Sequence, residues 1–243
     1  MSEELTTLIH SHSADDLNRA ASNAALSEEL ALALLERRDL PPETLEALSK
    51  NVAALKSRRV LAGVVGHIKT PRHVSLPIIR HLYTFELMQL ALSPTALADI
   101  RKAAEETLVS RLEKITLGER STLARRASGR VAAALLLDSE PRVVEAAVTN
   151  PFLTEVLVVK ALLSEKATAA LVELVCQDGK WSLRREVLIA LLRNPLTPAG
   201  QAAELAHTLP SGVLHELLLE SRLPESVRER LQQELQSREQ AEG

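Results

Sequence analysis

The chain has 243 residues, of which 46% are hydrophobic, 25% are charged and only 2% are aromatic, and its net charge is −3. Leu, Ala and Val must fill the core, and because Ala and Leu favour helices while sheets favour aromatic and β-branched residues, this composition predicts an all-α fold. A single cysteine, Cys176, excludes an internal disulfide and a cysteine-rich metal site.

In the first part of the chain, apolar residues recur with helical spacing. They form one stripe over 27–38 and another over 42–55. Further helix starts are expected where a hydroxyl residue that can cap free amides precedes a proline, as in Thr70-Pro71, Ser93-Pro94 and Thr197-Pro198. Thr116 and Glu119 have the spacing of a capping box.

The second half contains a recurring helix end. Asn150-Pro151 returns as Asn194-Pro195, 44 residues later. In each pair the proline prevents the helix from continuing, so both asparagines are predicted to end helices. A period of this length fits repeats of two helices each.

The C-terminal region is predicted to close the stack of helices. In 224–236 only Val227, Leu231 and Leu235 are apolar, as expected for a helix with one side in water. We therefore expect Leu231→Ala to destabilise the protein less than Leu157→Ala in an interior repeat. Residues 237–243 are expected to be a polar tail, and 1–236 to be one domain, with a boundary near residue 136 as the weaker alternative.

The residues around the first Asn-Pro pair carry a family resemblance. The segment 138–163, in which Arg142-Val143-Val144 is followed by Asn150-Pro151, resembles a leucine-rich variant repeat, a relative of HEAT and armadillo repeats. Residues 17–39 and 184–198 are similar to it in part. The resemblance implies an α-solenoid with a right-handed superhelix, whose usual use is to bind proteins or peptides. Some proteins with such repeats carry an iron–sulfur cluster on cysteines, but with one cysteine no cofactor is expected here.

The sequence lacks two common motifs of catalytic sites. The sequence has neither a glycine-rich phosphate loop nor a Gly-x-Ser-x-Gly elbow. His10 and His12 would lie on different sides of a helix, so no metal pair is expected. Cys176 is expected to be a small buried hydrophobe, and Trp181 to pack at a repeat junction. Gly129 interrupts a helical pattern. We therefore expect a protein that is not an enzyme.

The charge is unevenly distributed along the chain. Residues 51–130 hold 14 basic and 6 acidic residues, whereas 1–50 and 201–243 are acidic. This basic stretch either supplies salt bridges within the fold or attracts an acidic partner. If it binds, the expected contact residues are Arg59, Arg72, Arg80, Arg120, Arg125, Arg126 and Arg130.

Three functions are compatible with these features. An interaction module that binds an acidic protein or peptide fits best. The alternative is a nucleic-acid-binding HEAT-like protein that contacts the backbone, or an alkylpurine DNA glycosylase-like enzyme, although four aromatic residues offer little for base stacking. The third is self-association between acidic ends and basic middle. The acidic N-terminus and the lack of a long apolar run predict a cytoplasmic protein without membrane contact.

Overall fold

Every regular element in the described part of the chain is a helix. The computed structural model describes the backbone of residues 2–220 and 223–242 and the side chains of 4–220 and 223–240. Within these ranges there are 18 α-helices, one 3-10 helix and no strand, so the predicted all-α class is confirmed. The chain divides into two units, Met1–Lys114 and Ile115–Gly243. The alternative boundary near residue 136 falls inside the second unit.

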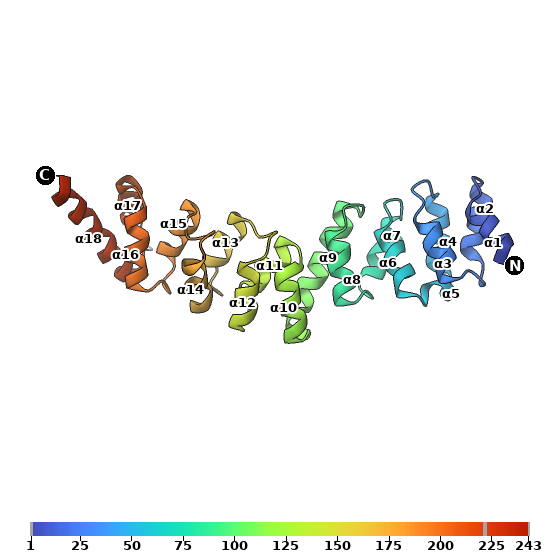
Figure 1. Ribbon diagram of the computed structural model, residues 1–243, viewed down its shortest axis with the longest axis horizontal. Helices are drawn as coiled ribbons and strands as arrows, with labels where there is room; N and C mark the ends of the chain where they lie inside the picture. Colours follow the sequence, from blue (N-terminus) through green and yellow to red (C-terminus); the bar gives the residue numbers. More distant parts are fainter. Residues whose placement is uncertain (1, 221–222, 243) are drawn as a thin grey trace. The chain divides into compact units, whose positions relative to one another are not determined.

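The first unit contains short helices that pack on their near neighbours in sequence (Figure 1). Most helices contact the next one or the next but one, so α1 lies on α3, α2 on α4, α6 on α8 and α7 on α9, while α3 lies on α6. The bounds are α1 Ser2–Ile9, α2 Ala14–Ser22, α3 Glu28–Leu35, α4 Pro42–Lys50, α5 Val52–Leu55, α6 Arg58–Gly66, α7 Arg72–Ile79, α8 Thr84–Leu92, α9 Ala98–Arg111 and the 3-10 helix η1 Leu112–Lys114.

The second unit repeats this packing. Contacts join α10 to α12, α11 to α13, α12 to α14, α13 to α15 and α16 to α18. Small and branched apolar residues fill the space between these helices, as the low aromatic content requires. The bounds are α10 Leu117–Arg126, α11 Gly129–Leu135, α12 Pro141–Val148, α13 Glu155–Leu162, α14 Ala169–Gln177, α15 Arg185–Arg193, α16 Ala199–Thr208, α17 Ser211–Leu218 and α18 Glu225–Glu242.

Buried asparagines tie alternate helices together at their carboxyl ends. Asn150 and Asn194 end helices, as predicted, and Asn51 ends α4 in the same way. The sequence did not reveal that each side-chain amide also reaches the end of the helix two places earlier along the chain. Their Nδ2 groups donate, over 2.6–3.0 Å, to the carbonyls of Ala21 and Asn23, of Ala124 and Ala127, and of Leu162.

Longer side chains form the same kind of tie elsewhere. Arg37 donates to the carbonyls that end α1, Arg111 to those that end α7, and Arg238 to those that end α16. Trp181 is 2% exposed, and its Nε1–H donates to the Val148 carbonyl at 3.0 Å. The expectation that Trp181 packs at a junction is confirmed. These ties satisfy carbonyls that a helix leaves without internal partners.

The predicted helix starts are confirmed in part. Thr116 and Glu119 form the expected capping box of α10. The hydroxyls of Thr70 and Thr197 instead donate backward, to the Val64 and Leu191 carbonyls near the ends of the preceding helices. The start expected at Pro94 is wrong, because α9 begins at Ala98. A hydroxyl residue before proline therefore also serves here to close the previous helix.

The closing helix is better anchored than expected. Instead of a polar tail after 236, α18 continues to Glu242. On it, Arg238 donates to three carbonyls at the end of α16 and to the Glu234 carboxylate. Residue 243 lies outside the described residues. Leu231 is 0% exposed, whereas Leu157 is only partly buried. This burial favours the opposite order of their contributions to stability.

Candidate functional site

The first unit has an open cavity of about 670 Å³ that crosses three helices of one layer. Its lining comes mainly from the middle and carboxyl-terminal parts of α3, α6 and α8 and from the residues that follow each of them. Glu86, in the first turn of α8, is the exception. Because the ends of these helices are aligned, the residues after them gather around the same opening. The cavity has the size range of small-molecule and side-chain pockets.

Small residues on the middle helix create this hollow. Ala62, Gly63 and Gly66 line it. Gly66 follows Gly63 by three residues and Ala62 by four, which places it on the same side of α6 as both. A Cβ atom at Gly63 would lie 2.9 Å from Leu35 Cδ1, and one at Gly66 would lie 3.6 Å from Leu90 Cδ1. Larger side chains at these positions would fill the space between α3 and α8.

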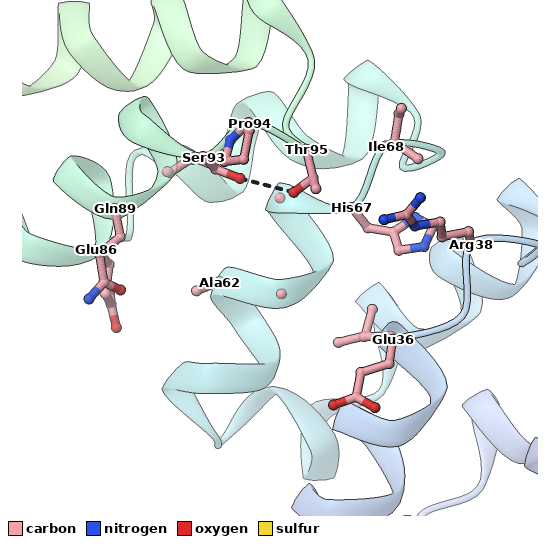
Figure 2. A pocket seen from close by; sticks show the side chains of 14 residues that line it. Glu36, Arg38, Ala62, His67, Ile68, Glu86, Gln89, Ser93, Pro94 and Thr95 are labelled. Carbon is pink, nitrogen blue, oxygen red and sulfur yellow. Dashed lines mark hydrogen bonds between the residues drawn. The ribbon is translucent and has the colours of Figure 1, made fainter. Parts of the chain in front are cut away.

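Polar side chains stand around this apolar floor. In Figure 2, Glu36 and Arg38 lie on one side of Ala62, and Glu86 and Gln89 on the other. At a third edge, the Ser93 and Thr95 hydroxyls are 3.0 Å apart and hydrogen-bonded to each other. A ligand in the cavity would therefore meet an apolar base and a polar rim.

Glu86 is held firmly by its own unit. Arg58 Nε and Nη2 donate to its two carboxylate oxygens at 3.0 and 2.5 Å, and the Tyr83 N–H donates to it at 2.7 Å. Burial alone would raise the pKa of Glu86, but the hydrogen bonds from Arg58 and Tyr83 and the Arg58 charge lower it below its usual value. Arg58 also lies over the Tyr83 ring, 3.9 Å from its centre. Glu86 therefore stays ionised and paired.

His67 has both ring nitrogens engaged at the cavity edge. Nε2 lies 2.8 Å from the Arg37 carbonyl, and Nδ1 accepts from the Lys69 N–H at 3.2 Å. A carbonyl can only accept, so the ring carries its proton on Nε2 and is neutral in this arrangement. The neighbouring Arg38 and Glu36 are exposed, and neither forms an ion pair within the described part of the chain.

The first unit contains three of the seven arginines expected to bind. Arg59 lies 3.4 Å from the Glu28 carboxylate, and Arg72 lies 2.6 Å from that of Asp99. Both remain largely exposed, so these surface pairs contribute little to stability. Arg80 is exposed, and its backbone carbonyl accepts from Arg111.

The second unit contains the other four. Arg120 is mostly buried and pairs at 2.9 Å with Asp138, whose side chain is 9% exposed. Arg125 and Arg126 lie exposed in the last turn of α10, and Arg130 is exposed on α11. The predicted set is thus divided between two units and contains one arginine with a clear structural role.

The other chemical candidates have ordinary surroundings. Cys176 is half-buried, and burial together with Glu173 and Glu204 raises the pKa of its thiol to about 11. A thiol held in this state is a poor nucleophile. In the described ranges, no group of three His, Cys, Asp or Glu residues could hold a metal ion. Likewise, no described helix is long and apolar enough to cross a membrane.

No family model, curated protein or solved structure matches this chain. The sequence did not predict this cavity. The signal that could have found it is the cluster of Ala62, Gly63 and Gly66 in an otherwise bulky helix.

Proposed function

We propose that this chain is a non-enzymatic interaction module, an α-solenoid of the HEAT-like or leucine-rich variant type. Support for the solenoid comes from the contacts between alternate helices in both units and from the recurring ties at their carboxyl ends. The asparagines at 150 and 194, 44 residues apart, make such ties at matching places. Repeats of this type stack on their neighbours and offer a continuous surface to a partner.

The cavity across α3, α6 and α8 carries the proposal that this module binds peptide segments of a protein partner. It is open, it combines an apolar floor with a polar rim, and it lies on the aligned ends of three helices. An open site of this kind fits a side chain that a partner inserts. Glu86 is fixed in an ion pair, which favours binding over acid–base chemistry.

The exposed pair Arg125 and Arg126 favours a second candidate, contact with a nucleic-acid backbone. Two adjacent guanidinium groups would bind phosphates, and such binding weakens steeply with salt. Fluorescence polarisation with a labelled single-stranded oligonucleotide tests it. Loss of binding in the double variant Arg125→Gln/Arg126→Gln would support this candidate, and equal binding would reject it.

Selection from a displayed library of random peptides tests the main proposal. Peptides selected on the native chain should lose binding to Gly66→Leu, because the new side chain fills the cavity. The matched control is Gly200→Leu, a position with nothing within 4 Å of its Cβ, which should bind normally. A library that yields no binding peptide, or peptides that bind both variants alike, would reject the proposal.

A further inference from the structure

The cavity in the first unit has a charge pattern that selects among peptides. We infer that it takes a segment in which a bulky apolar residue has an acidic neighbour, with the carboxylate on Arg38. This inference rests on the proposed function, because it specifies the ligand of the same site.

The floor accounts for the apolar residue. Gly63 and Gly66 expose the α6 backbone, and Leu35 and Leu90 flank it. A Leu-sized side chain would cover this surface and displace water from it, which favours binding in proportion to the apolar area covered. A polar side chain would gain little there, because the side-chain atoms nearest to the two glycines are carbons of Leu35 and Leu90.

On one wall of the cavity, the Arg58–Glu86 pair leaves little net negative charge to attract a cationic ligand. Glu86 is the more buried acid of the lining, and both of its oxygens accept from Arg58. Because Arg58 neutralises this carboxylate and fills its acceptor sites, a cationic ligand would have to compete with an intramolecular bidentate pair.

The opposite wall accounts for the carboxylate. Arg38 lines the cavity, and Lys69 follows the lining residue Ile68; both are exposed and neither has an acidic partner among the described residues. His67, which is hydrogen-bonded to the Arg37 carbonyl and the Lys69 N–H, is neutral in this arrangement. Glu36 is the single acid on this wall, so positive charge prevails. The planar fork of Arg38 suits a carboxylate.

Two matched peptides test this inference directly. They are acetyl-Gly-Leu-Glu-Gly-amide and acetyl-Gly-Leu-Lys-Gly-amide, titrated into the ¹⁵N-labelled full chain while amide NMR shifts are followed. The glutamate peptide should shift the amides of Gly63, Gly66 and Ile68 and bind roughly threefold more tightly, the size expected for one exposed ion pair. Added salt should reduce this difference.

Variants of the rim assign the preference. Arg38→Gln should abolish the difference between the two peptides, and Glu36→Gln should enlarge it. Far-ultraviolet circular dichroism checks that both variants keep the native helix content. The salt dependence of the native chain gives a second readout that needs no variant.

The outcomes separate the inference from the proposed function. If both peptides bind equally and Gly66→Leu abolishes both, the module binds peptides but the inferred acidic preference is wrong. Tighter binding of the lysine peptide, or no binding of either, also overturns the inference. Failure of the library selection as well would remove the proposed function with it.

Discussion

At the scale of single residues, Gly129 shows how one missing side chain permits a junction. It is the first residue of α11, and a Cβ atom there would overlap the backbone carbonyl of Phe152. Gly129→Ala should therefore destabilise the protein by about 3 kcal/mol, since a backbone neighbour cannot easily move. Gly118→Ala, with open space at its Cβ, should be neutral or stabilising. Equal urea midpoints for the two variants would contradict this account.

The half-buried thiol of Cys176 leads to a prediction about reactivity. With its pKa raised to about 11, little thiolate exists near neutral pH. Iodoacetamide at about pH 8 should alkylate the native chain much more slowly than the chain in urea, where the thiol returns to its ordinary pKa of about 8.5. Equal rates in the two states, followed by mass spectrometry, would show that burial does not protect it.

The Glu86–Arg58 pair predicts a dependence of stability on pH. The pKa of Glu86 is lowered in the folded state, so its contribution is present above the unfolded pKa and is lost as pH falls through the folded one. Glu86→Gln should therefore reduce the free energy of unfolding at about pH 7 but much less at about pH 3. Urea titrations at both values measure this. A difference that stays constant with pH would contradict it.

At the scale of helices, the ties between alternate carboxyl ends should dominate the effect of mutations. Asn150 is 0% exposed, and its amide satisfies two buried carbonyls. Asn150→Ala should lower the free energy of unfolding by about 2–3 kcal/mol, because the Ala124 and Ala127 carbonyls lose their partner. Asn23→Ala removes an exposed local hydrogen bond and should have a much smaller effect. Similar denaturation midpoints for both would argue against the ties.

The closing helix gives a second comparison. Leu231 is fully buried on α18, whereas Leu157 on α13 is only partly buried. Leu231→Ala should therefore destabilise by about 2–5 kcal/mol and Leu157→Ala by less. Thermal melts of both variants test the order. If Leu157→Ala were the more damaging, α18 would be attached less firmly than its contacts indicate.

Sequence patterns predicted the helices better than the contacts between them. Asn150 and Asn194 marked helix ends because proline follows each, a local effect. The carbonyls that their amides bind lie 23–32 residues earlier, and no local pattern identifies such a partner. In the same way, Leu231 looked half-exposed because its neighbours in sequence are polar, but the space it fills is formed by other helices.

At the scale of the whole chain, the candidate site could not be derived from charge alone. Residues 51–130 carry an excess of basic side chains, but Arg58, Arg111 and Arg120 form ion pairs or hydrogen bonds within the fold. Their partners are carbonyls or acids on another helix or just after one, so counting charges overstated the free positive surface. The cavity forms because Gly63 and Gly66 on α6 face Leu35 on α3 and Leu90 on α8. Such a match between helices can be recognised only when their packing is known.

The hydrogen-bonded ties between helices join residues that are near in sequence, and this affects both how the chain folds and how it can gain or lose helices. The side-chain bonds described between helices join residues at most 33 positions apart. Chains dominated by such near contacts close small loops and fold quickly. Each helix pair can complete its bonds as soon as the next pair has left the ribosome. Duplication or loss of one helix pair would likewise leave the ties of distant pairs intact. The chain could therefore become longer or shorter by one helix pair at a time.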